Sequence, residues 1–197
     1  MSMELSKEKY PTRDLALKKH TYLIYDTFEE RQRMVVPYLC AGLANQEKCL
    51  YIMDHNIIPE ITAGLDKQGV NAWTLQNHVS FFPIREAFLF ESQFDPYQAT
   101  LFLTEQARQA NREGYAALRF CCEMGGIVPY ISDTKVLVKY ETLLNRFIFC
   151  KYNCTALCLY EARQFQSELL LEVEAVHAHP PGKSRPRYEG LMLEANR

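Results

Sequence analysis

The sequence has 197 residues, of which 48% are hydrophobic and 23% charged, a composition typical of an ordinary globular protein of one domain. Its 22 basic and 24 acidic residues give a net charge of −2, so no basic field attracts nucleic acid or anionic lipid. The apolar runs are shorter than a membrane span and the first residues are too polar for a signal peptide. We therefore expect a cytoplasmic protein without direct contacts to nucleic acid or membrane.

Five short apolar runs rich in strand-forming residues predict five strands. In chain order they cover residues 20–25, 49–53, 79–84, 115–122 and 154–160. Stretches with helical spacing of apolar residues separate and follow them. These stretches cover residues 27–43, 56–68, 95–113, 137–147 and 165–176. The alternation, with nearly continuous apolar strands, predicts an α/β fold: a three-layer sandwich with a mostly parallel central sheet and helices on both faces.

Local signals place the starts of two helices. Thr27 followed by Glu30 is a capping box, in which both side chains satisfy free backbone N–H groups. Asp95 followed by Pro96 marks a second start, because aspartate caps a helix and proline is tolerated at its first position. Pro37 lies inside the first helical stretch, where it predicts a kink or a restart.

The two ends of the chain differ in composition from the middle. Residues 1–17 show little periodicity and are expected to form a leader. Residues 181–197 form a tail rich in helix breakers, in which 191–193 offers an edge strand packed on the domain. The tripeptide at 182–184 resembles the end of a phosphate-binding loop, but the required glycine, strand and helix are missing. The domain is therefore expected over residues 18–180.

Ligands of parallel α/β sheets bind beyond the carboxyl ends of the strands. The residues that follow each predicted strand are therefore the first candidates for a ligand site. They are Tyr25 and Asp26, Asp54 and His55, residues 121–126, and residues 160–163. These polar, aromatic and thiol-bearing residues form no recognisable catalytic constellation, and the motifs of serine hydrolases, zinc peptidases and dinucleotide-binding enzymes are missing. We therefore expect a protein that is not an enzyme.

Arg119 is the most informative charged residue, because it lies in the middle of the fourth predicted strand. A buried guanidinium without a partner costs several kcal/mol, so a carboxylate must meet it. Glu141, at the margin of the buried stripe of a later helix, is the predicted partner. The pair is either a structural ion pair or the polar anchor of a ligand pocket, to which Tyr25, Tyr140 and Tyr160 would add apolar walls and hydroxyl groups.

The seven cysteines are an odd number and are expected to be reduced thiols. Cys121 and Cys122 are adjacent in a strand and must point to opposite faces, whereas Cys154 and Cys158 share one face. Core packing, contact with a ligand and metal binding are all open for these thiols.

The histidines also leave a structural role and a ligand-binding role open. His177 and His179 either offer two ligands to a metal or simply end a helix before two prolines. His20, at the start of the first strand, is either a hydrogen-bonded structural residue or a ligand-binding one. We assign no metal ligand from these patterns, and the cofactor stays open.

Several stretches together resemble one known family, the MEDS domain, the methanogen and methylotroph sensory domain. They are HTYLIYDTFEE, VVPYLCAGLANQEKCLYI, FDPYQATLFLTEQARQANREGYAALRFCCEM, KYETLLNRF and CTALCLYEAR. The resemblance covers nearly the whole chain. It implies a RecA-like α/β sandwich without a phosphate loop, and a non-catalytic sensory domain for a small, largely apolar ligand of the hydrocarbon-derivative class.

The residues that match the family's pattern are His20, Tyr25, Glu47, Arg119, Tyr140, Glu141, Cys158 and Tyr160. From the pattern and the predicted pocket we expect a set of ligand-binding residues. The set comprises His20, Tyr25, Arg119, Cys121, Tyr140, Glu141, Cys158 and Tyr160. The sensory unit uses up the chain, so the expected partners are a small-molecule ligand and a separate signalling or transcriptional protein.

Other functions stay open beside this one. A thiol-based redox or metal sensor would use the cysteines, and it requires exposed thiols with a low pKa. A degenerate nucleotide-binding protein and an adaptor subunit are further alternatives, and a homodimer is compatible with each of them.

Overall fold

The computed structural model describes residues 20–178. The leader, the tail with its expected edge strand, His179 and the tripeptide at 182–184 lie outside the described residues. The central sheet has five strands in the order β1-β7-β6-β2-β3, and every neighbouring pair is parallel. The strands are β1 (His20–Tyr25), β2 (Lys48–Met53), β3 (Val79–Pro83), β6 (Leu118–Glu123) and β7 (Cys154–Glu161).

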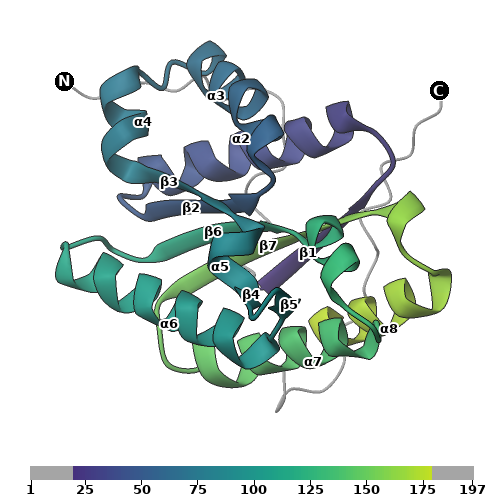
Figure 1. The fold of residues 1–197 in the computed structure, drawn as a ribbon. Helices are drawn as coiled ribbons and strands as arrows, with labels where there is room; N and C mark the ends of the chain where they lie inside the picture. The colour runs from purple at the N-terminus through teal and green to yellow at the C-terminus, as the bar shows by residue number, and fades with distance from the viewer. Residues whose placement is uncertain (1–19, 179–197) are drawn as a thin grey trace.

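Helices cover both faces of this sheet and make the outer layers of a sandwich (Figure 1). One face carries α2 (Phe28–Ala44), with α3 (Ile58–Lys67) packed beside it, and α4 (Ala72–His78) leads into β3. The other face carries α6 (Pro96–Arg112), α7 (Lys135–Leu143) and α8 (Ser167–Ala178). The predicted three-layer α/β sandwich is therefore confirmed. No described helix combines the length and apolar character needed to cross a membrane.

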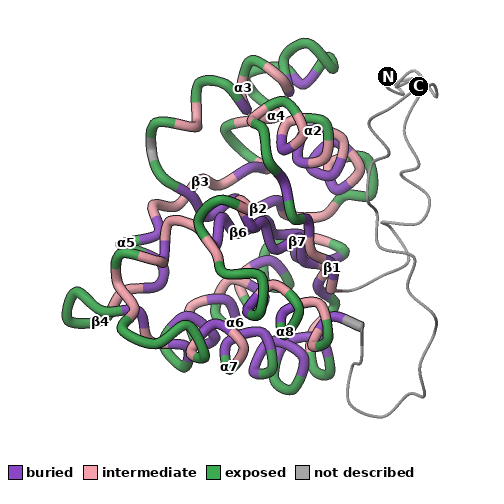
Figure 2. The backbone as a smooth tube through the Cα atoms, turned by 90° about the vertical axis from the view of Figure 1, so that its right-hand side faces the viewer, coloured by how far each residue is buried: buried purple, intermediate pink, exposed green. Residues whose placement is uncertain are grey.

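Two separate cores form because side chains alternate along each strand. In β7, Ala156 and Cys158 face the α6–α8 side, whereas Leu157 and Leu159 face the α2 side. Figure 2 shows the buried residues concentrated in the central strands, with exposed residues on the outer helices and loops. The prediction that Cys121 and Cys122 point to opposite faces is confirmed, since they belong to different cores.

Both predicted helix starts are confirmed by their caps. The Thr27 hydroxyl accepts a hydrogen bond from the Glu30 backbone N–H, and the Glu30 carboxylate accepts one from the Thr27 N–H. The Asp95 carboxylate accepts from the backbone at the start of α6, with Pro96 as first residue. The expected restart at Pro37 is wrong, because α2 continues through it. One missing N–H is outweighed by buried contacts of α2 such as those of Leu39.

The sequence pattern does not predict the short elements near the carboxyl edge of the sheet. The helix α5 (Ile84–Phe88) follows β3 at once, and β4 (Leu89–Phe90) pairs with β5 (Gln93–Phe94) as a small hairpin. Its turn holds two non-glycine residues at positive φ, which is a weak sequence signal. The helix predicted over 137–147 is α7 followed by a π-helical turn over 144–148.

Candidate functional site

The sheet divides the predicted ligand-binding residues between its two faces. On the α6–α8 face lie the side chains of His20, Tyr140, Glu141, Cys158 and Tyr160. On the α2 face lie Tyr25, Arg119 and Cys121. The predicted residues therefore cannot line one pocket, because the sheet itself separates them.

The predicted ion pair between Arg119 and Glu141 is wrong. Arg119 Nε instead donates to Glu47 Oε2 at 2.5 Å, and its guanidinium lies over the Tyr38 ring at 4.5 Å. The cause is strand alternation: Arg119 shares a face with Cys121, on the side opposite α7. A Cβ at Gly42 would lie 2.5 Å from the Arg119 side chain, so this glycine makes room for the guanidinium. With Arg119 only 1% exposed, the pair belongs to the core.

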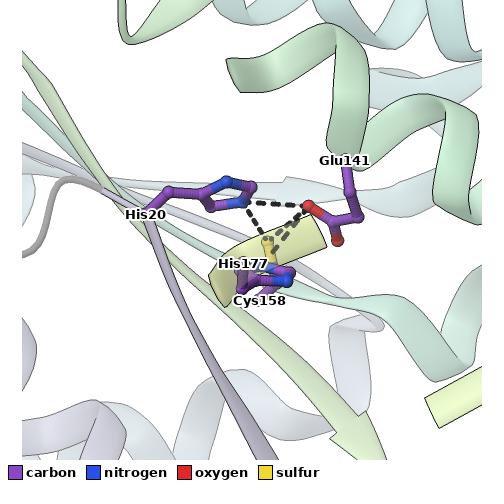
Figure 3. Close-up of side chains that lie close together, drawn as sticks. All are labelled: His20, Glu141, Cys158 and His177. Atoms are coloured by element: carbon purple, nitrogen blue, oxygen red, sulfur yellow. Dashed lines mark hydrogen bonds and ion pairs between the residues drawn. The ribbon is translucent and has the colours of Figure 1, made fainter. Parts of the chain in front are cut away.

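A second polar group lies on the opposite face around the fully buried Glu141 of α7. We call it the Glu141 centre and define it as His20, Glu141, Cys158 and His177. The other three residues come from the start of β1, the middle of β7 and the last turn of α8. Figure 3 shows the four side chains converging.

One oxygen of the carboxylate receives most of these contacts. Glu141 Oε2 lies 2.9 Å from His20 Nε2, 3.5 Å from Cys158 Sγ and 3.6 Å from His177 Nε2. The other oxygen accepts a hydrogen bond from the Tyr160 hydroxyl. Cys158 Sγ also lies 3.6 Å from His20 Nε2. The Glu141 centre is thus held by four different elements of the fold.

Outer contacts orient both imidazoles. His177 Nδ1 lies 2.8 Å from the carbonyl oxygen of Val173, one turn earlier in α8. His20 Nδ1 lies 2.9 Å from Asn145 Oδ1, and Asn145 Nδ2 donates to the carbonyl of Val176 at 3.2 Å. These contacts leave the two Nε2 atoms pointing at Glu141.

The surroundings of Glu141 set its protonation state. Burial by itself raises the pKa of the Glu141 carboxyl, but His177, His20 and the Tyr160 hydroxyl outweigh it and lower that pKa to about 2. Burial and the neighbouring His20 lower the pKa of His177 to about 4, and burial raises the pKa of Cys158. At neutral pH, therefore, Glu141 is ionised, His177 is neutral and the Cys158 thiol keeps its proton.

The four residues could also hold a metal ion. Each offers one ligand atom, and these four atoms lie within 4.8 Å of one another. The sequence left His177 open between a metal ligand and a helix end, and His177 is not among the predicted ligand-binding residues. The available signal was its place four residues after the buried Val173, which continues the inward stripe of α8.

Another buried carboxylate lies at the carboxyl edge of the sheet, on the α2 face. We call it the Glu123 centre and define it as Glu123, Tyr25, Tyr51 and Arg31. Glu123 accepts hydrogen bonds from Tyr25, at 2.9 Å, and from Tyr51, and Arg31 Nη1 lies 3.6 Å away. Burial raises the pKa of Glu123 against the opposing effect of Arg31. The predicted residue Tyr25 therefore belongs to a centre different from that of His20.

Six of the seven cysteines lack the exposure that a thiol redox sensor requires. All seven are free, and only Cys150 is exposed. Burial raises the pKa of Cys40 to about 11 and that of Cys49 to about 12. Burial likewise raises the pKa of Cys121 and Cys122. These thiols are protonated at neutral pH and shielded from solvent, so they are poor redox groups.

Surface hollows lie away from both centres. One of about 440 Å³ is lined by residues of α6 and the loops before β6 and β7, among them Tyr115 and Asn153. Another of about 350 Å³ is lined by the β4–β5 hairpin and a neighbouring loop, among them Phe94 and Tyr130. Neither includes a residue of the Glu141 or Glu123 centre.

The protein is a parallel α/β sandwich, and its Glu141 and Glu123 centres are enclosed between the sheet and the helices that cover it. The family model described as "MEDS: MEthanogen/methylotroph, DcmR Sensory domain" matches residues 19–178. The chain belongs to the MEDS family, and the resemblance seen in its sequence is confirmed. It is accordingly a sensory domain. A comparison with curated proteins finds no match.

Proposed function

We propose that this chain is a non-catalytic sensory domain that binds a small, largely apolar ligand at the Glu141 centre and relays its occupancy to a separate regulatory protein. The observation that carries the proposal is the convergence of His20, Glu141 and His177 from three elements, with Glu141 fully buried and the two imidazoles nearly so. Buried polar groups with incomplete hydrogen bonding are costly, so their presence calls for a function.

The surroundings suit a small ligand with one polar end. The Phe149 ring stacks on His20 with centroids 4.6 Å apart, and the Tyr22 ring lies 5.0 Å from that of His177. Aromatic walls next to a carboxylate and two imidazoles would hold an apolar body and orient its polar group. The close packing favours a ligand of few atoms.

The C-terminal helix α8 is the element best placed to relay binding. It contributes His177 to the Glu141 centre, and its Glu174 accepts a hydrogen bond from Tyr22 of β1 at 2.9 Å. A ligand between Glu141 and His177 would displace the end of α8 and shift the population of its docked state. That shift would change the surface offered to a partner.

Thermal unfolding with a panel of small alcohols, amines and alkyl halides at millimolar concentration tests ligand binding. A ligand at about 100 times its dissociation constant stabilises by about 2.7 kcal/mol, which raises Tm by roughly 5–10 °C for a chain of this size. The shift should vanish in Glu141→Gln and persist in Glu123→Gln, the matched variant on the other face. No shift with any compound, or equal shifts in both variants, contradicts the proposed site.

Hydrogen exchange tests the relay separately. Binding should change the protection of residues 167–178 more than that of the α2 face. Binding without any change in α8 would leave the ligand site standing and exclude α8 as the relay.

A further inference from the structure

We infer that His20, Glu141, Cys158 and His177 bind one transition-metal ion of the zinc type. The inference deepens the proposed function, because the ion would occupy the same Glu141 centre and offer its polar contact to the ligand. The sequence alone assigns no metal ligand, and only the structure brings these four residues together. Three observations carry it: the spacing of the ligand atoms, the tautomers of the imidazoles and the charge of the donor set.

At least three of the six distances between the ligand atoms fit tetrahedral coordination, and all six are within 4.8 Å. Zinc bonds of about 2.0–2.3 Å at tetrahedral angles place neighbouring ligand atoms roughly 3.3–3.8 Å apart. In the Glu141 centre, Glu141 Oε2 lies 3.5 Å from Cys158 Sγ and 3.6 Å from His177 Nε2, and Cys158 Sγ lies 3.6 Å from His20 Nε2. The contact between His20 and Glu141, at 2.9 Å, is shorter and needs a few tenths of an ångström of adjustment.

The tautomer of His177 leaves a lone pair directed into the Glu141 centre. A carbonyl oxygen only accepts, so His177 Nδ1 carries the proton that it donates to Val173. In the neutral ring Nε2 is then an acceptor, and its nearest charged neighbour is the Glu141 carboxylate, another acceptor. His177 Nε2 is buried and makes no hydrogen bond with any residue in the described part of the chain. A cation between the two acceptors would satisfy both.

His20 has the same orientation. Because Asn145 Nδ2 donates to the Val176 carbonyl, its Oδ1 faces His20 Nδ1 and accepts from it. With its proton on Nδ1, the His20 ring presents Nε2 as a lone-pair donor aimed at Glu141. A proton on His20 Nε2 would satisfy this one contact and still leave His177 Nε2 without a partner, whereas a metal ion satisfies both rings.

The donor set also balances the charge of a divalent ion. On binding, a new bond joins the metal to Cys158 Sγ, the S–H bond breaks and its proton leaves to the buffer. A thiolate and a carboxylate then neutralise the two positive charges, and both imidazoles bind as neutral ligands. Thiolate and imidazole favour zinc, cobalt, nickel or copper over magnesium and calcium, which prefer oxygen ligands.

The outer contacts match those of a built metal site. Metal-binding histidines usually donate their second N–H to a carbonyl or carboxylate, and ligating carboxylates are themselves hydrogen-bonded. Here Val173 and Asn145 accept from the two imidazoles, and Tyr160 donates to the free oxygen of Glu141.

Cobalt titration of the whole chain, stripped with a chelator, tests the site directly. We expect one equivalent of Co²⁺ to bind, with a sulfur-to-cobalt charge-transfer band and the visible absorption of tetrahedral cobalt, and Zn²⁺ to displace it. Cys158→Ser should remove the charge-transfer band, and Cys154→Ser, on the same strand and face, should keep it. Asn145→Ala, which removes the outer contacts to His20 and to the Val176 carbonyl but no ligand atom, should weaken binding about 10–100-fold.

Each outcome is decisive. No bound cobalt in the folded wild-type protein, or an unchanged band in Cys158→Ser, overturns the inference. If Cys158→Ser does not fold, as judged by circular dichroism, the wild-type charge-transfer band and the Asn145→Ala titration decide instead. Metal binding without a response to small organic compounds would support the metal site and exclude the proposed organic ligand. A response to organic compounds without metal binding would support the organic ligand and exclude the metal site.

Discussion

Glu141 and Glu123 are both buried glutamates that accept hydrogen bonds from tyrosines, yet their surroundings differ in kind. Glu123 accepts hydrogen bonds from two tyrosine hydroxyls and lies near the Arg31 guanidinium, and all three groups bring hydrogen atoms. Glu141 also accepts from the Tyr160 hydroxyl, but it faces two imidazole Nε2 atoms as well, and the proton of His177 is engaged with the Val173 carbonyl. Each centre holds one buried atom without a hydrogen-bond partner in the described part of the chain: Arg31 Nε, which carries a hydrogen, and His177 Nε2, which carries a lone pair. Only the second of these atoms can bind a metal ion, as proposed for the Glu141 centre. The difference teaches that burial alone does not mark a functional carboxylate.

The largest expected effect concerns Arg119, a third buried charged residue, whose charge is already paired within the chain. Arg119→Ala should lower the free energy of unfolding by about 3–5 kcal/mol, because it leaves the Glu47 carboxylate without its cation and empties the space beside Tyr38. Urea unfolding measures the effect. The exposed Arg112→Ala, with its ion pair on the surface, should change stability little.

A near-neutral effect of Arg119→Ala would contradict the view of this ion pair as part of the core. It would also reopen the earlier alternative, in which the guanidinium anchors a ligand.

The second prediction compares one hydroxyl at each glutamate centre. Tyr160→Phe removes the donor to the ionised Glu141 and should cost about 1.5–3 kcal/mol, as expected for a hydrogen bond to a charged group. Tyr25→Phe should cost about 1 kcal/mol, since Tyr51 still donates to Glu123. Urea unfolding of metal-free protein measures both. A larger loss for Tyr25→Phe would reverse the contrast between the two centres.

Much of the fold could be predicted from the sequence, because strands buried on both faces leave continuous apolar runs. The five predicted strands and the caps at Thr27 and Asp95 are confirmed. The fourth strand begins at Leu118, three residues later than predicted, because the stretch from residue 115 belongs to the preceding loop. Short elements such as the β4–β5 hairpin lack the length that a periodic pattern needs.

The candidate site was harder to predict, for a physical reason. Strand alternation already places Arg119 and Cys121 on one face, but the sequence does not say which helix covers that face. The partner of Arg119 was therefore assigned to α7 instead of to Glu47 before β2. His20, Glu141 and Cys158 are predicted from the sequence, but His177 is left between a metal ligand and a helix end, because only the packing of α8 brings it to β1.

The smallest expected effect is the dependence of stability on pH that the Glu123 centre contributes. Burial raises the pKa of Glu123 above 4.5, aided by Glu161 and opposed by Arg31, Tyr51 and Tyr25. A carboxyl whose pKa is raised by folding contributes its full stability below pH 4.5 and loses it as pH rises through the folded pKa. The free energy of unfolding of the wild type, relative to Glu123→Gln, should therefore fall with rising pH. Urea unfolding at a series of pH values measures this difference. A difference that grows with pH would mean that Glu123 is stabilised as a carboxylate, and the contrast between the two glutamate centres would then disappear.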